Sequence, residues 1–423
     1  MSRRLLIAGP VFHGAQDGGL HIALNDLARE LQRFGWEVES AVEESAANGH
    51  PASPAPFTHA LHSPLARLKR WPLVSALWRC LPVVLRRCIS FAAMPRELFE
   101  DASATLRSLE ERLTRDAQYD AVLLCVDGSM PGTAACVMHR HPRVLVLSLG
   151  GLAEELGAAW WPVARRIARF RLGGEMHPLL FRRIAPEQVV RAVFASEAWR
   201  LNAVQAGLDP LRSETVYFGI PVGPIAPRPP VTRGRILWIG RLIPAKGLHH
   251  LLEALPELRR HLPEFSVTAI AGPGPQAYRE ELEALVNRLG LGKHVEIRSG
   301  VERQALQAIY AEHDVLFFHS ENPEPVALTL LEAFAAGIPV VATQPQTPSD
   351  TLNHNLTCLL CPPHAPQQLA DALRALLDDP ARAKALRTAA RDHVEQHYSS
   401  QRMGERFNGL LDALLHTQDG QRV

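Results

Sequence analysis

Apolar positions along this chain come in short continuous runs separated by longer segments with helical periodicity. This alternation is typical of α/β folds. In the first half, the runs predicted to be strands are 3–8, 119–126, 143–149, 191–196 and 214–220. Because their apolar residues are consecutive rather than alternating with polar ones, these runs indicate a parallel sheet covered on both faces. After the first run, a helix is predicted from apolar residues at helical spacing, namely Ile22, Leu24, Leu27, Leu31 and Phe34.

The second half repeats the same alternation. Predicted strands there are 235–241, 266–272, 294–300, 314–320, 338–343 and 357–362. Predicted helices lie between them at 247–261, 275–289, 302–312 and 327–336. The tail 366–416 is predicted to be helical, with one apolar face made of Leu369, Leu373, Leu376 and Leu377.

The proline-rich stretch GIPVGPIAPRPPVTRG separates the halves and is predicted to be a stiff linker. The chain is therefore divided into domains at 1–221 and 234–400, a linker at 222–233, and a C-terminal helix at 401–423. That helix is expected to pack back toward the first domain. Two doubly wound domains bind ligands in the crevice outside the carboxyl ends of their strands.

The composition is that of a soluble globular protein, and it does not indicate which kind of molecule the protein binds. The chain has 423 residues, of which 47% are hydrophobic and 21% charged, as in soluble globular proteins. No uncharged apolar stretch approaches the roughly 20 residues of a spanning helix. The opening MSRRLLIAGPVF has two arginines before an apolar run, as a signal peptide does, but Gly9 and Pro10 interrupt that run. It is therefore predicted to be a first buried strand. Scattered cysteines indicate a reducing compartment, with Cys358 and Cys361 as buried thiols rather than zinc ligands.

Two glycine-containing loops are candidate phosphate sites. In IGRLIPAKG, Arg241 follows a strand and Lys246 precedes a helix, so both cations and the helix N-terminus can face one phosphate. The alternative is a solvated strand end with incidental charge. In AIAGPGPQA, Gly272 and Gly274 resemble a dinucleotide fingerprint, but the acidic partner for a nicotinamide ribose is missing. A turn that needs close backbone approach is the better interpretation.

Two glutamates, Glu324 and Glu332, form an E-x7-E pattern around an apolar helix. One interpretation makes Glu324 a residue favoured by the helix dipole and Glu332 a solvated one. However, Glu332 lies in LTLLEAFAAG, which should be buried. A buried carboxylate without a partner is costly, so a bound polar ligand explains it better.

Taken together, these motifs resemble a known family. The segments QDGGLHIALNDLARELQRFGWEVE, ILWIGRLIPAKGLHHLLEALPEL, AGPGP, YAEHDVLFFHSEN and ENPEPVALTLLEAFAAGIPVVAT are similar to the retaining GT-B glycosyltransferases of family 4, the glycosyl transferases group 1 family. The agreement is strongest over 190–400 and weaker over 1–190. The resemblance implies two Rossmann-like domains facing each other across a cleft, the first holding the acceptor and the second a nucleotide-sugar.

The resemblance also implies roles for particular residues. Arg241 and Lys246 would hold the diphosphate, Glu332 the ribose hydroxyls, and Glu324 the donor sugar near its reacting carbon. With Glu324, the two cations form the expected catalytic set. Further donor-binding positions are Gly18, Gly19, Gly272, Val326, Ala327 and Leu328. No D-x-D occurs, so no bridging metal is expected, and the cations would stabilise the leaving diphosphate. The nucleotide-diphosphate-sugar would be the donor substrate, and no metal site or cofactor is expected. Front-face attack would retain the anomeric configuration, with the departing phosphate accepting the proton.

The chain departs from the family pattern at several places. Val326 and Ala327 replace the usual aromatic-glycine pair, and TQPQTPSD replaces a frequent glycine pair. A histidine that the family commonly places at a strand end of the first domain is absent from CVDGSM and LSLGGL. Asp127 is the candidate acceptor-side residue there.

Two basic, tryptophan-containing segments, 65–91 and 160–174, suit an anionic membrane surface. The alternative is that their arginine stems cover apolar surface of the first domain. No nucleic-acid motif accompanies these segments, so nucleic acid is not an expected partner.

The predicted function is therefore that of a cytoplasmic enzyme, peripheral at the inner face of the plasma membrane. It would transfer a sugar from a nucleotide-sugar to a saccharide or lipid-linked acceptor in surface polysaccharide or glycolipid assembly. A nucleotide-sugar 2-epimerase, a catalytically silent homologue and a nicotinamide dehydrogenase are the alternatives, because fold alone does not separate them.

Overall fold

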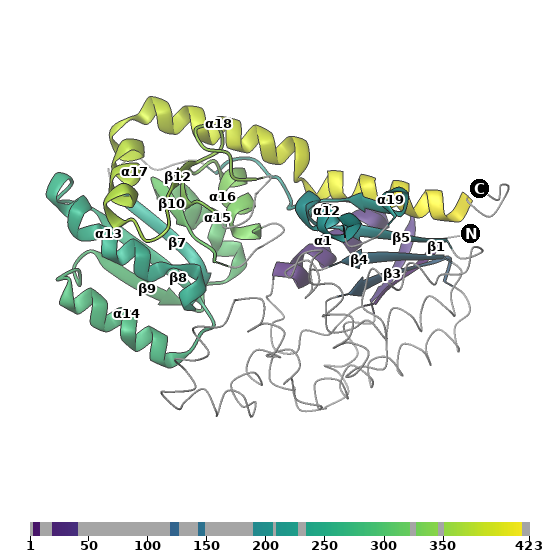
Figure 1. Ribbon diagram of the computed structural model, residues 1–423, viewed down its shortest axis with the longest axis horizontal. Helices are drawn as coiled ribbons and strands as arrows, with labels where there is room; N and C mark the ends of the chain where they lie inside the picture. The colour runs from purple at the N-terminus through teal and green to yellow at the C-terminus, as the bar shows by residue number, and fades with distance from the viewer. Residues whose placement is uncertain are drawn as a thin grey trace. The chain divides into compact units, whose positions relative to one another are not determined.

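A computed structural model describes most of the second half of the chain and separate parts of the first (Figure 1). The described residues are 3–8, 19–40, 119–126, 143–148, 189–205, 209–226, 234–321, 327–345 and 351–416. The chain forms two compact units, one of residues 1–217 with 403–423 and one of residues 218–402.

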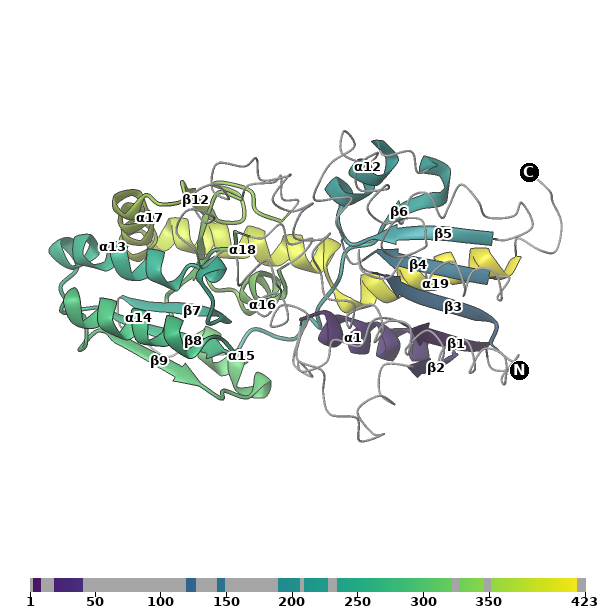
Figure 2. The ribbon, with the colours of Figure 1, turned by 60° about the horizontal axis from the view of Figure 1, so that its bottom comes forward.

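The first unit is built on a parallel sheet. Its described strands are β1 (Arg3–Ala8), β2 (Trp36–Ser40), β3 (Ala121–Val126), β4 (Arg143–Ser148), β5 (Val189–Phe194) and β6 (Ser213–Thr215). They are ordered β2-β1-β3-β4-β5-β6, and Figure 2 shows this order with β6 at the top and β2 at the bottom of the sheet. From β1, strand β2 is added on one side and strands β3 to β6 on the other, so the switch point lies between β1 and β3. Doubly wound sheets bind ligands in the crevice at such a switch point.

Consecutive apolar residues in the inner strands explain why the middle of this sheet is buried on both faces. In β1, Leu5 and Leu6 are fully buried, and in β3 every residue from 121 to 124 is fully buried. The helices within the described residues of this unit are α1 (Gly19–Arg33), α12 (Glu197–Gln205), the 3-10 turn η2 (Pro210–Arg212) and α19 (Ser400–His416). α1 directs Leu27 and Leu31 into the core.

Residues 403–416 of α19 belong to the first unit although they come last in the chain. The indole of Trp36 donates a hydrogen bond to the Asn408 side chain (2.8 Å), and Arg3 forms an ion pair with Asp412. At Gly404 a Cβ would lie 2.5 Å from the Cβ of Glu30, so glycine permits close approach to α1.

The second unit has a sheet of the same type. Its strands are β7 (Arg235–Arg241), β8 (Ser266–Gly272), β9 (Val295–Ser299), β10 (Val315–Phe318), β11 (Val340–Thr343) and β12 (Leu359–Cys361). All the pairings are parallel, in the order β12-β11-β10-β7-β8-β9. Read from β9, this is the 3-2-1-4-5-6 strand order of dinucleotide-binding sheets, and its switch point lies between β7 and β10.

Helices cover both faces of this second sheet (Figures 1 and 2). They are η3 (Pro244–Lys246), α13 (Leu248–His261), α14 (Gln276–Arg288), α15 (Arg303–Glu312), α16 (Leu328–Ala336), α17 (Pro366–Asp378) and α18 (Pro380–His397). α13 packs against α14 and α17, whereas α16 packs against α15 and α18. The main core cluster includes Trp238, Leu251, Leu282 and Leu373.

Most elements agree with the sequence predictions, and three corrections stand out. The strand predicted at 214–220 is only Ser213–Thr215, and Ile220 instead forms an isolated bridge with Ser399. The strand Trp36–Ser40 was not predicted. Phe34, predicted on the apolar face of α1, lies beyond the end of that helix and is exposed.

The compact units divide after Tyr217 and after Arg402. Residues 222–226 of the expected linker fall in the second unit, and 227–233 lie outside the described residues. Among the described helices, none combines the length and apolar character needed to cross a bilayer. Cys125, Cys358 and Cys361 are buried free thiols, and burial raises the pKa of Cys358 to about 12.

Candidate functional site

The loop after β7 carries both predicted phosphate ligands. Arg241 ends the strand and is exposed, and its guanidinium makes no hydrogen bond or ion pair within the described part of the chain. Lys246 ends η3, whose first residue is Pro244. Its carbonyl accepts a hydrogen bond from the buried Trp238 indole (3.0 Å), which fixes the loop to the core.

Helix α13 begins directly after this loop. Gly247 adopts a φ of +66° and provides no side-chain cap for the helix. The first N–H groups of a helix need partners from outside the helix, and an anion satisfies them well. The loop therefore combines an exposed guanidinium, an ammonium and a helix N-terminus.

The loop after β10 packs against the loop after β7. The Glu321 amide donates a hydrogen bond to the Ala245 carbonyl (3.0 Å), and the Lys246 ammonium donates one to the Ser320 hydroxyl (3.3 Å). A Cβ on Gly247 would lie 2.3 Å from the His319 ring, so the two loops are in tight contact. Since β7 and β10 flank the switch point, these loops form the expected ligand-binding edge of the sheet.

Gly272 ends β8 and is paired in register with Arg241. The Leu242 amide reaches the Gly272 carbonyl at 3.4 Å. At Gly274, a Cβ would lie 2.0 Å from the Leu242 carbonyl oxygen. The interpretation of AGPGP as a turn that needs close backbone approach is therefore confirmed.

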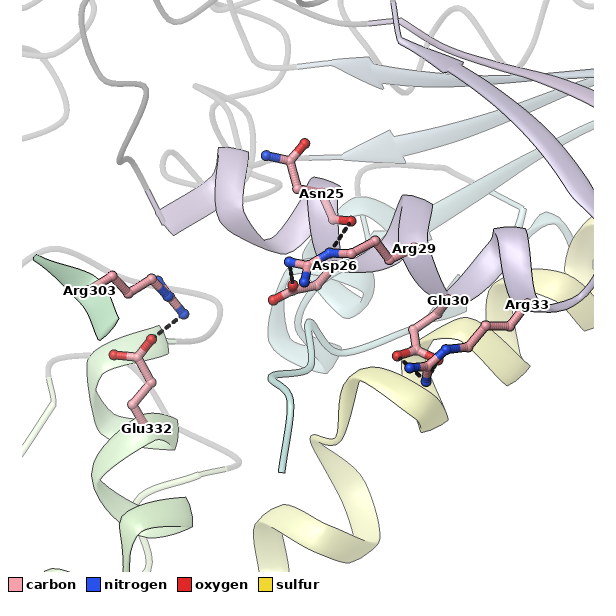
Figure 3. Close-up of polar contacts among 7 residues, drawn as sticks. All are labelled: Asn25, Asp26, Arg29, Glu30, Arg33, Arg303 and Glu332. Carbon is pink, nitrogen blue, oxygen red and sulfur yellow. Dashed lines mark hydrogen bonds and ion pairs between the residues drawn. The ribbon is translucent and has the colours of Figure 1, made fainter. Parts of the chain in front are cut away.

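Glu332, in the second turn of α16, has protein partners (Figure 3). Its carboxylate forms an ion pair with Arg303 and accepts a hydrogen bond from the Tyr310 hydroxyl (3.4 Å). Burial and the adjacent Glu332 raise the pKa of Tyr310 well above its usual value. The argument that Glu332 needs a ligand because it lacks a partner was therefore wrong. Ala327 and Leu328 are the N-cap and first residue of α16.

Sequence reasoning missed a group of histidines beside these loops. His250 contacts the rings of His249, His319 and His364. Burial lowers the pKa of His250 and of His319 to about 4, and the neighbouring histidines add to the effect. A pair of adjacent histidines in the apolar helix GLHHLLEAL was the available signal.

Comparison with known proteins identifies the family. Residues 226–393 match the model for "Glycosyl transferases group 1". The GDP-mannose-dependent alpha-(1-6)-phosphatidylinositol monomannoside mannosyltransferase of Mycolicibacterium smegmatis is 30% identical over 286 residues, 64% of this chain and 70% of the relative. The chain belongs to the glycosyl transferases group 1 family. It is therefore a glycosyltransferase, as the resemblance of its motifs implied.

Solved structures agree on the fold of this glycosyltransferase. The Anabaena protein Alr3699/HepE, crystallised with UDP-glucose, aligns with a TM-score of 0.64 at 17% identity, covering 97% of this chain and 99% of that one. Sucrose-phosphate synthase from Thermosynechococcus elongatus gives a TM-score of 0.68 at 20% identity, with coverage of 97% and 99%. The predicted GT-B architecture of two Rossmann-like α/β domains is confirmed.

Several residues predicted for this glycosyltransferase fall outside the described part of the chain. They are Gly18, Glu324, Val326, Asp127 and the basic segments 65–91 and 160–174. Gly19 is the first residue of α1. Within the second unit, the structure brings Arg241, Lys246 and Gly272 to one edge of the sheet.

Proposed function

We propose that this glycosyltransferase moves a sugar from a nucleotide-diphosphate-sugar to a saccharide or lipid-linked acceptor, with retention of anomeric configuration. The observation that carries the proposal is the loop Arg241–Gly247 at the switch point of the second sheet. There, two cations and the N-terminus of α13 come from one short segment.

The chemistry of the leaving group supports this assignment. When the glycosidic bond to the diphosphate breaks, negative charge grows on the phosphate oxygens. Fixed cations and N–H dipoles that are already in place stabilise this charge without reorganising. Lys246 is held by Ser320 and by the packing of its loop, and Arg241 is exposed at the end of β7, where a phosphate can reach its guanidinium.

Glu324 and Glu332 complete the proposed donor site. Glu332 would bind the ribose hydroxyls, with Arg303 and Tyr310 holding its carboxylate in place. Glu324 would face the donor sugar near the reacting carbon. In this proposal the attacking hydroxyl approaches from the face of the leaving group, the departing phosphate takes its proton, and no metal bridges the diphosphate.

The acceptor side of the proposal draws on the relatives. The mycobacterial relative is named for action on a phosphatidylinositol monomannoside, which is a lipid-linked sugar. A lipid-linked acceptor would also suit the basic segments 65–91 and 160–174, with arginines and tryptophans at an anionic membrane surface. We place the enzyme on the cytoplasmic face of the membrane, in surface polysaccharide or glycolipid assembly, with Asp127 on the acceptor side.

Calorimetric titration of UDP-glucose and GDP-mannose into the protein tests the donor site. Arg241→Ala should weaken the better-binding nucleotide-sugar roughly 10- to 150-fold, because a hydrogen bond to a charged group is lost. Arg288→Ala, at the end of α14, is the matched control and should leave affinity unchanged.

Equal affinity of the parent protein and Arg241→Ala would contradict the proposed site. NMR of the donor with the protein then separates the alternatives. Interconversion of the donor sugar without any acceptor would indicate an epimerase. Absence of donor hydrolysis in the parent would indicate a silent homologue, whereas hydrolysis that disappears in Glu324→Ala supports the transferase.

A further inference from the structure

Two histidines and one glutamate, each from a separate segment, lie close together beside the loop that carries Lys246. His250 lies in the first turn of α13, Glu321 follows β10, and His364 lies between β12 and α17. One ligand atom from each residue lies within 4.8 Å of the other two. In the sheet order β12-β11-β10-β7, all three segments reach the same carboxyl edge.

The ring of His250 is buried without a hydrogen-bond partner. The residue is only 5% exposed, and neither Nδ1 nor Nε2 bonds to any residue in the described ranges. Buried polar groups in proteins are almost always hydrogen-bonded, so two unpartnered nitrogens on one ring need an explanation. An ion that accepts the lone pair of one nitrogen accounts for that nitrogen, and the other nitrogen carries the ring proton.

His319 repeats this feature next to His250. It is 4% exposed, its Nδ1 is 2.7 Å from the Thr343 hydroxyl, and its Nε2 has no hydrogen-bond partner among the described residues. The rings of His250 and His319 are 4.8 Å apart, centroid to centroid. Two buried imidazoles therefore present unpartnered nitrogens in the same small region.

Two carboxylates lie close to these imidazole nitrogens. A Glu253 oxygen lies 3.8 Å from the His250 Nδ1, and a Glu321 oxygen lies 3.9 Å from the His319 Nε2. Lys246 is the opposing positive charge, and its ammonium donates a hydrogen bond to Ser320. These two carboxylates can offset part of the positive charge of a bound ion.

We propose that His250, His364 and Glu321 bind a divalent transition metal, for which Zn²⁺ is the best-matched ion. Two imidazole nitrogens and one carboxylate oxygen are a donor set that zinc accepts, with one coordination position left for water. Bond lengths near 2.0–2.1 Å place ligand atoms roughly 3.4 Å apart around the ion. Glu321 and His364 are exposed and close the remaining distance by side-chain rotation.

Such an ion would join three segments at the base of the phosphate loop. His250 follows Lys246 closely in the chain, and the Glu321 amide is bonded to Ala245. Metal binding would therefore stabilise the loop, because the ion would bind His250, which follows the loop in the chain, and Glu321, whose amide is bonded to the loop. The prediction that the chain has no metal ligands came from the missing D-x-D, a pattern for ions that bridge the diphosphate. The proposed site has a different donor set and is independent of the donor-binding proposal.

The test is titration of Zn²⁺ into protein stripped with a chelator, followed by calorimetry, with Co²⁺ absorbance as a second probe of coordination. His364→Gly and Glu321→Gln each remove one ligand. Glycine adopts the φ of +56° found at His364 without strain, so this change keeps the backbone conformation. Each variant should bind Zn²⁺ about 10- to 100-fold more weakly or worse, because altering even the surroundings of a ligand has effects of that size.

The matched control is His261→Ala, at the exposed far end of α13, which should bind Zn²⁺ as the parent does. Zn²⁺ should also raise the melting temperature of the parent and of His261→Ala, but not that of the two ligand variants. Unchanged Zn²⁺ affinity in both ligand variants would overturn the proposal, since the ion would then be bound elsewhere. A parent protein that binds no Zn²⁺ would overturn it directly. Neither result bears on nucleotide-sugar binding.

Discussion

Glu332 shows how one side chain can be both paired and functional. Its carboxylate has Arg303 and Tyr310 as protein partners, so burial alone no longer argues for a ligand. However, Arg303 is 44% exposed at its side chain and Glu332 16%. Exposed ion pairs contribute little stability, and water or a ribose hydroxyl can still reach the carboxylate. The pair therefore leaves the proposed ribose contact available.

Single substitutions separate the two roles of Glu332. Glu332→Ala should weaken nucleotide-sugar binding about 10- to 100-fold, because a charged acceptor of hydrogen bonds is lost. Arg303→Ala keeps the carboxylate and its Tyr310 partner, so it should weaken donor binding much less than Glu332→Ala does and change the free energy of unfolding by less than about 1 kcal/mol. Calorimetry and denaturant unfolding measure both effects. If the two variants bound donor equally well, Glu332 would have only the structural role.

The turn that joins β7 to α13 depends on Gly247, which has a φ of +66° and packs against His319. A methyl group there meets both a conformational and a steric penalty. Gly247→Ala should therefore destabilise the protein by more than the roughly 1–2 kcal/mol that positive φ alone costs. Because the loop carries Lys246, donor affinity should fall as well. Thermal unfolding and donor titration provide the measurements.

Gly290→Ala is the matched control, since Gly290 has a φ of +63° and a Cβ there would meet only the end of Arg259, at 3.9 Å. The Gly290→Ala variant has the free-energy cost of a positive φ without a steric clash, and the loop that contains Gly290 is not predicted to bind the donor. Equal destabilisation in the two variants would show that contact between Gly247 and His319 is unimportant.

The elements that the sequence predicted best are those whose apolar run coincides with a complete strand that has a buried centre. β7 and β8 match their predicted ranges, 235–241 and 266–272. β2 was missed because WEVES alternates polar and apolar residues at the sheet edge, directly after a strong helical pattern. The local pattern of apolar residues was enough to predict β7 and β8 but not to predict β2.

The candidate site divides in the same way. Arg241 and Lys246 come from one loop, so their spacing in sequence was sufficient to predict that they lie together. His250, Glu321 and His364 come from three loops, and their proximity follows from the order in which β12, β11, β10 and β7 pair. That order depends on long-range packing, which periodicity does not encode.

At the scale of the whole molecule, the chain leaves the first unit after Tyr217 and returns to it after Arg402. The returning residues supply part of the first unit's core: Phe407, Leu411 and Leu414 are fully buried. The C-terminal helix is thus structural for a unit whose sheet was formed by residues far earlier in the chain.

This arrangement predicts that damage at the C-terminus is felt in the first unit. Phe407→Ala should cost about 3–5 kcal/mol, because a buried aromatic ring is replaced by a cavity. Hydrogen exchange should then accelerate in β1 and β3 while β7 and β8 keep their protection, since each unit has its own core. Leu211→Ala, at a side chain that is 87% exposed, is the control and should change stability by less than about 0.5 kcal/mol. Faster exchange in β7 and β8 to the same extent would mean that the two units unfold as one, and that the last helix supports the whole molecule rather than the first unit alone.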